Sequence, residues 1–139
     1  MSSPVSITVR TVISAPVSRV WECFTQPQHI TRWNFAVPEW HCPAAENDLR
    51  PGGKFSWRME AKDGSFGFDF AGTYTDVRPN ELIAYTIGDG RKVHVTFMTD
   101  GDSTEVTETF EAESQNPVEM QRGGWQAILD NFRKHAEAG

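Results

Sequence analysis

The stretch from residue 54 to residue 112 alternates apolar and polar side chains in one short segment after another. The segment KFSWRME, for example, places Phe55, Trp57 and Met59 on one face, as a half-buried β-strand does. Turn residues separate the segments, and Arg50-Pro51-Gly52-Gly53 precedes them as a turn with Gly at the position that needs a positive φ. Because connections this short cannot hold a helical crossover, the strands must run antiparallel. This stretch predicts a meander.

Helical patterns lie on the amino-terminal side of the meander, after one more predicted strand over residues 6–12. Pro16 suits the first position of a helix, and an apolar stripe with helical spacing runs from Val17 to Phe24. Pro27 ends that helix and can open a second, short one that reaches about Arg32. Residues 33–48 show no regular period and are expected to be irregular.

A long helix is predicted over residues 117–137, because apolar residues recur with a 3.6-residue period from Trp125 to Ala136. At 1.5 Å per residue it would be about 31 Å long, enough to cross a small sheet. The glycines at 123 and 124 would let a neighbour pack closely or let the helix bend. The predicted fold class is α+β, with a curved antiparallel sheet of about seven strands around this helix. We expect a single domain over residues 1–139, with a cavity between sheet and helix.

The composition excludes several classes of protein. The formal net charge of −6 argues against general nucleic-acid binding, which needs a basic face. No apolar run approaches the roughly 20 residues that span a bilayer. The first residues lack a basic segment followed by an apolar one, so no secretion signal is predicted and a cytoplasmic location is expected.

The cysteines, Cys23 and Cys42, are too few for a disulfide framework and are expected to be reduced thiols. His41 precedes Cys42, but adjacent residues rarely bind one ion, and no second ligand pair stands at helix or hairpin spacing. Neither a metal nor another cofactor is therefore predicted.

Several motifs carry a resemblance to a known family. They are ISAPVSRVWECFTQPQHITRW, NDLRPGGKF, GTYTDVRPNELIAYT, TEVTETFEA and QRGGWQAILDNFRKH, in this order. The chain resembles the START-like (SRPBCC) helix-grip superfamily, in the branch named for homologues of the activator of heat-shock protein 90 ATPase. The resemblance covers about Val5 to His135. It implies a helix-grip fold that encloses an apolar pocket; superfamily members bind lipids, sterols, polyketides and hormones, and some are cyclases or hydrolases.

The aromatic content of 12% exceeds what a core of this size requires. Large aromatic residues with a polar group suit a pocket that orients a ligand of mixed polarity. The predicted pocket opens near residues 34–47. Its predicted ligand-binding residues are Trp33, Phe35, Trp40, Trp57, Met59, Phe68, Tyr85, Met120, Trp125 and Leu129.

Glu108 is the first candidate for chemistry, because it shares strand parity with Val106 and Phe110 and should point to the apolar face. A protonated carboxyl there could act as a general acid or base. The alternatives are an ion pair with a residue such as Arg58, or a bulge that turns Glu108 outward. His41, and secondarily His29, are further acid–base candidates near the expected mouth.

Three functions from different classes remain open. The first is a module that binds a small apolar or amphipathic molecule, which the missing nucleophile–base pair favours. The second is a cyclase- or hydrolase-like enzyme that uses Glu108 or His41. The third is a module that contacts a chaperone, as the family name suggests. No nucleic-acid partner is expected.

Overall fold

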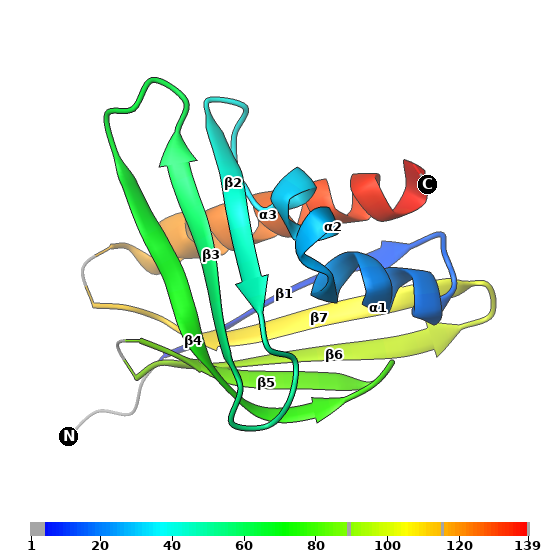
Figure 1. The fold of residues 1–139 in the computed structure, drawn as a ribbon. Helices are drawn as coiled ribbons and strands as arrows, with labels where there is room; N and C mark the ends of the chain where they lie inside the picture. Colours follow the sequence, from blue (N-terminus) through cyan, green and yellow to red (C-terminus); the bar gives the residue numbers. More distant parts are fainter. Residues whose placement is uncertain (1–4, 89, 115, 139) are drawn as a thin grey trace.

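The computed structural model describes residues 5–88, 90–114 and 116–138. Over these residues the chain forms a strand, two short helices, a run of further strands and a long helix (Figure 1). The elements are β1 (Ser6–Ile13), α1 (Val17–Thr25), α2 (Pro27–Trp33), β2 (Trp40–Asn47), β3 (Lys54–Ala61), β4 (Gly67–Arg78), β5 (Leu82–Ile87), β6 (Lys92–Asp100), β7 (Ser103–Glu111) and α3 (Val118–Ala138). The described helices include none that is long and apolar enough to cross a membrane.

The strands form one antiparallel sheet in the order β1-β7-β6-β5-β4-β3-β2. From β2 to β7 every strand pairs with its neighbour in sequence, so the predicted meander is confirmed. The turn at 50–53 also forms as expected: Gly52 has a φ of 84°, and Gly53 N–H donates to the carbonyl of Arg50 at 2.8 Å. β1 returns to the far edge and pairs with β7, with Ile7 opposite Phe110. The α+β helix-grip architecture is therefore as predicted.

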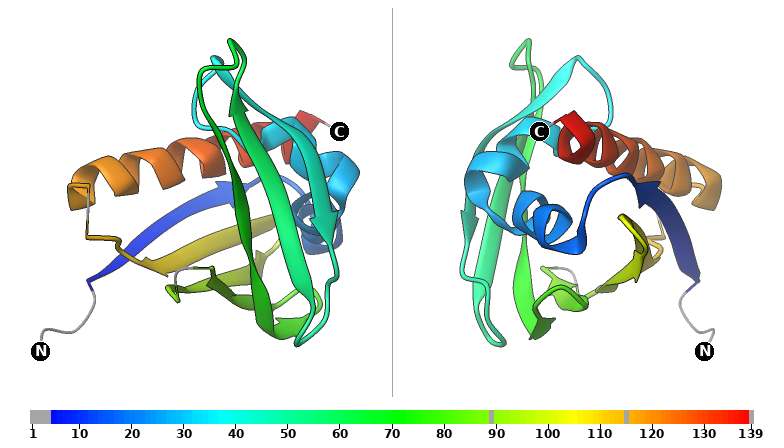
Figure 2. Two further views of the ribbon diagram at one scale, coloured as in Figure 1. Left: turned by 60° about the vertical axis from the view of Figure 1, so that its left-hand side comes forward. Right: turned by 90° about the vertical axis from the view of Figure 1, so that its right-hand side faces the viewer.

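The sheet curls around one side of α3, as the two views of Figure 2 show. β4 takes part in this curvature through Gly72 and a register shift between Tyr74 and Asp76. A Cβ atom on Gly72 would lie 2.3 Å from the carbonyl oxygen of Thr86 and 2.9 Å from the ring of Phe55. Only glycine permits this close approach of backbone and ring.

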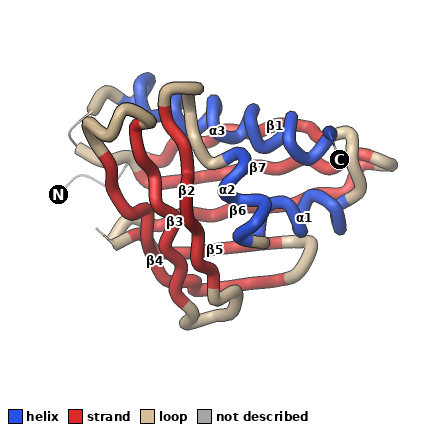
Figure 3. The backbone as a smooth tube through the Cα atoms, turned by 45° about the horizontal axis from the view of Figure 1, so that its top comes forward, coloured by secondary structure: helices blue, strands red, loops and turns tan. Residues whose placement is uncertain are grey.

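The helices cover the concave side of the sheet, with α1 and α2 at one end and α3 running across it (Figure 3). Phe132 of α3 is fully buried, and its ring meets those of Phe24 and Trp33 at centroid distances of 5.2 and 4.9 Å. These edge-to-face contacts join the three helices into one core. Near the amino-terminal end of α3, side chains no longer fill the space between the helix and the sheet.

Two expectations need correction. Residues 40–47 are not irregular but form β2 at the edge of the sheet. Pro43 lies in this strand, and a bulge between His41 and Ala44 shifts its register, so no alternation shows in the sequence. Close packing does not explain Gly123 and Gly124, because a Cβ atom on either would meet no atom of another described segment within 4 Å.

Candidate functional site

A cavity of about 360 Å³ lies between the curled sheet and the first half of α3. α1 and α2 close it on one side, and strands β3, β4, β5 and β7 form its floor. Its lining residues are Phe24, Trp33, Asn34, Trp57, Met59, Phe68, Phe70, Tyr85, Arg91, Glu108, Glu113, Asn116, Met120, Gln121, Trp125 and Ile128. The volume is within the range of small-molecule pockets, and most of the wall is aromatic.

The aromatic wall is built by strand alternation and by one helix. Trp57 of β3 stacks on Phe70 of the neighbouring β4, with 5.7 Å between ring centroids. Trp125 of α3 stacks on Phe110 of β7 at 3.8 Å and meets the edge of Phe70 at 6.1 Å. Trp125 therefore joins the helix to both halves of the sheet while one side of it faces the cavity.

Most of the predicted pocket residues line this cavity: Trp33, Trp57, Met59, Phe68, Tyr85, Met120 and Trp125. Three predicted residues do not. Trp40 packs against Phe68 outside the cavity, the carbonyl of Phe35 accepts a hydrogen bond from Asn131, and Leu129 is buried in the core. Binding of a ligand by the lining residues stays a prediction.

Several lining residues were missed from the sequence. Phe24 and Ile128 belong to helical stripes that were assigned to the core, and Phe70 shares the face of Phe68, which was the available signal. Asn34 and Gln121 are buried polar residues outside any strand pattern. No periodicity marks such residues, so sequence reasoning had no means to place them.

The mouth of the cavity lies between the tip of β4 and the start of α3. Met120 and Phe68 line the cavity and are also 64% and 40% exposed, so the cavity reaches the surface there. Gln121 holds the rim: its Oε1 accepts from the backbone N–H of Glu113, and its Nε2 donates to the carbonyl of Asn116 at 2.8 Å. Asn34 also lines the cavity, and Trp40 of β2 packs against Phe68, so an opening near residues 34–47 stays a prediction.

Trp57 offers an unused hydrogen-bond donor inside the cavity. The residue is 4% exposed, and none of the described residues accepts a hydrogen bond from its indole Nε1–H. Trp33 differs, because its Nε1–H donates to the carbonyl of Cys23 at 2.9 Å. A buried donor without an acceptor costs roughly 1–3 kcal/mol. A bound molecule with an acceptor would recover that free energy.

Glu108 points into the cavity, as its strand parity predicted, and is 7% exposed. None of the described residues forms a hydrogen bond or an ion pair with its carboxyl group. Arg58, the alternative partner, instead bonds Glu60 and lies 3.5 Å from Asp69. Burial raises the pKa of Glu108 to about 8, so the carboxyl group holds its proton at neutral pH.

Tyr85 adds a hydroxyl group to the same wall. Burial raises the pKa of Tyr85 well above its usual value, and the nearby carboxyl group of Glu108 raises it further. The phenol is therefore neutral and can both donate and accept a hydrogen bond. Trp57, Tyr85 and Glu108 together give an apolar cavity a few polar groups, all uncharged at neutral pH.

The candidate histidines lie outside the cavity. His41 sits on β2, is 42% exposed at its side chain, and has Glu60 3.5 Å from its Nε2. His29 of α2 contacts His135 instead, with 2.9 Å between Nδ1 of His29 and Nε2 of His135. Neither histidine is among the lining residues, so of the predicted acid–base candidates Glu108 is the one that faces the cavity.

Comparison with known proteins gives matches over nearly the whole chain. Residues 14–137 match the family model described as activator of Hsp90 ATPase homolog 1-like protein. The AHSA1-like protein from Aeromonas hydrophila, solved in solution, is 41% identical, with a TM-score of 0.91 over 96% of this chain and 93% of that chain. Chr148 from Cytophaga hutchinsonii is 50% identical, with a TM-score of 0.83 over 96% and 92%.

More distant structures share the fold alone. Protein NE0264 from Nitrosomonas europaea is 18% identical, with a TM-score of 0.84 over 99% of this chain and 97% of that chain. No curated protein matches the sequence. The family match spans residues 14–137, and every residue that lines the cavity falls inside that range.

Proposed function

Because the chain belongs to the family of activator of Hsp90 ATPase homolog 1-like proteins and encloses an aromatic cavity, we propose that it binds a small, largely apolar molecule with one polar end. The observation that carries the proposal is the buried Nε1–H of Trp57, which has no hydrogen-bond partner among the residues that the structure describes. The ligand is expected to enter at the mouth beside Met120 and Phe68.

The polar end of the ligand follows from the groups that face the cavity. The Nε1–H of Trp57 can only donate. Glu108 keeps its proton at neutral pH and so offers an O–H donor together with a carbonyl oxygen. An oxygen that accepts a hydrogen bond, such as that of a ketone, an ester or an alcohol, suits both residues. A carboxylate or a phosphate suits these two residues less, because neither of them carries a positive charge that would balance an anion. Arg91 is the cation among the described lining residues, and its guanidinium already donates to the backbone carbonyl of Glu111 at 3.3 Å.

The first experiment is native mass spectrometry of freshly purified protein, which detects a bound molecule by its added mass. The second compares 2-naphthol with naphthalene by titration calorimetry, since the two probes differ only by a hydroxyl group. We expect 2-naphthol to bind about 5-fold more tightly, the worth of one net hydrogen bond of roughly 1 kcal/mol.

The matched variants are Trp57→Phe, which keeps an aromatic ring but removes the N–H, and Trp40→Phe, which lies outside the cavity. Trp57→Phe should reduce the preference for 2-naphthol, and Trp40→Phe should leave it unchanged. An unchanged preference in Trp57→Phe would remove Trp57 from ligand recognition. Failure of both probes to bind, with no added mass in the native protein, would refute the binding function.

The raised pKa of Glu108 favours a second candidate, a cyclase- or hydrolase-like enzyme. A carboxyl group with a pKa near the working pH is suited to general acid or base catalysis. In this mechanism Glu108 would donate its proton to an oxygen of a cavity-bound substrate or remove one from it. Turnover in a substrate screen that disappears in Glu108→Gln, while 2-naphthol still binds, would support catalysis; turnover that survives would exclude Glu108.

A further inference from the structure

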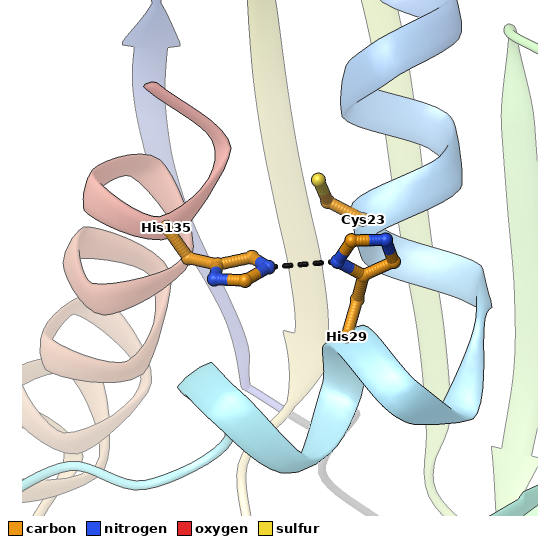
Figure 4. A group of neighbouring side chains, drawn as sticks. All are labelled: Cys23, His29 and His135. Atoms are coloured by element: carbon orange, nitrogen blue, oxygen red, sulfur yellow. Dashed lines mark hydrogen bonds between the residues drawn. The ribbon is translucent and has the colours of Figure 1, made fainter. Parts of the chain in front are cut away.

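Three side chains with metal-binding atoms meet at the junction of the helices, away from the cavity (Figure 4). Cys23 comes from the last part of α1, His29 from the first turn of α2 and His135 from the last turn of α3. One ligand atom from each lies within 4.8 Å of the other two. No local spacing predicts this cluster, because His135 lies more than a hundred residues along the chain from Cys23 and His29.

We propose that Cys23, His29 and His135 form a binding site for a divalent transition-metal ion, with Zn²⁺ the best match. One thiolate and two imidazoles are a common ligand set for zinc, which leaves a fourth position for water. Around a tetrahedral Zn²⁺ with bonds of about 2.0–2.3 Å, ligand atoms lie about 3.4–3.6 Å apart. The cluster therefore needs to contract by about 1 Å at its widest, which side-chain rotation can supply.

Glu22 supplies a second observation that favours a metal site. Its carboxylate Oε1 lies 3.4 Å from Nε2 of His29, on the side of the ring that faces away from the cluster. A carboxylate in this position holds the proton on Nε2 and leaves the Nδ1 lone pair directed at the metal. The hydrogen bond between Nδ1 of His29 and Nε2 of His135 has a direction that depends on the tautomers, and with the proton of His29 on Nε2 the donor is Nε2–H of His135. Binding requires His135 to carry its proton on Nδ1 instead.

The residues around the proposed metal site leave a path for an ion and affect the protonation of its ligands. Cys23 is fully buried, but the His29 side chain is 18% exposed and His135 is partly exposed, so an ion can approach over the histidines. Burial lowers the pKa of His135, with His29, Arg19 and Arg32 adding to the effect, so its ring is neutral and can ligate. Burial raises the pKa of the Cys23 thiol, so metal binding must release that proton.

The two arginines oppose a cation, whereas the thiolate, Glu22 and the carboxyl ends of α1 and α3 attract it. A bound ion would tie the end of α3 to α1 and α2. It would then add a covalent-strength link between segments that packing and the hydrogen bond between the two imidazoles already join.

The test is a titration of tag-free, reduced protein with Co²⁺, because the absorption spectrum of bound Co²⁺ shows which ligand atoms surround it. We expect one Co²⁺ per chain, a sulfur-to-cobalt charge-transfer band, visible bands of tetrahedral intensity, and loss of all of them when Zn²⁺ is added. Zn²⁺ should also raise the melting temperature, because it binds only the folded state.

The chain provides matched controls for each ligand type. Cys23→Ala should abolish the charge-transfer band, and the double variant His29→Ala/His135→Ala should weaken binding by at least about 100-fold, beyond the loss typical of an outer-shell residue. Glu22→Gln should weaken it about 10-fold. Cys42→Ala and His94→Ala remove the same residue types elsewhere and should change nothing.

Three results would overturn the proposal: no charge-transfer band in the folded wild-type protein, a band that survives in Cys23→Ala, or equal affinity in the double histidine variant. Circular dichroism of each variant shows whether it is folded. The double histidine variant decides the matter if Cys23→Ala fails to fold, since both imidazoles lie at least partly at the surface.

Discussion

Glu108 places an acidic group inside an aromatic cavity, so its ionisation affects the stability of the whole protein. Burial raises its pKa from the usual 4.5 to about 8. Below about pH 4.5 both the folded and the unfolded chain hold the proton. Between pH 4.5 and pH 8 the unfolded chain releases it while the folded chain retains it, so the free energy of unfolding falls as the pH rises.

We therefore expect Glu108→Gln to be more stable than the wild type at pH 8, by as much as about 4 kcal/mol, and similar to it at pH 5. Urea unfolding at pH 5, 6, 7 and 8 measures this difference. His135, which also has a shifted pKa, is present in both proteins and does not affect the comparison. Glu105→Gln, on the same strand but on its outer face, should follow the wild type. Parallel curves for wild type and Glu108→Gln would show that Glu108 ionises freely.

Residues on strands could be placed from the sequence because alternation fixes which way a side chain points. Trp57 and Glu108 face the concave side for this reason. Asn34 follows a helix and Gln121 lies in the first turn of another, where no period of two exists. Trp40 and His41 were misplaced because their strand carries a bulge that hides its alternation.

At the scale of elements, α3 carries a local weakness beside the mouth of the cavity. Gly123 and Gly124 lie in its second turn, and within the described part of the chain no other segment comes within 4 Å of their Cβ positions. Glycine in a helix costs up to about 1 kcal/mol relative to alanine. Gly123→Ala and Gly124→Ala should each raise the free energy of unfolding by about that amount, as measured by urea denaturation.

The binding of 2-naphthol to the same variants gives the control. Affinity that is unchanged alongside the added stability means that the glycines have no part in ligand affinity. A lower free energy of unfolding in either variant would contradict this prediction. It would indicate that α3 needs the backbone freedom of glycine at that position. Periodicity alone could predict that α3 exists and which stripe is buried, but not that its glycines face open space.

For the fold as a whole, the order of elements was predictable from the sequence, but the pairing of β1 with β7 was not. Hairpin-length turns fix the meander from β2 to β7. The pairing of β1 with β7 joins residues about a hundred positions apart, such as Ile7 and Phe110, and no local pattern specifies it. The cavity also depends on elements far apart in the sequence, because α1, α2, the middle strands and α3 all contribute to its lining. The cluster of Cys23, His29 and His135 depends on the same long-range assembly.

Since the cavity lies between elements from both ends of the chain, a ligand inside it should stabilise the fold as a whole. At a 2-naphthol concentration 100 times its measured Kd, we expect the free energy of unfolding to rise by about 2.7 kcal/mol. For a chain of this length that corresponds to a rise in melting temperature of roughly 10 °C. Hydrogen exchange should slow in β3, β4 and the first half of α3, which line the cavity. Slowing confined to the outer face of β5 and β6, with these segments unchanged, would place the bound probe outside the cavity.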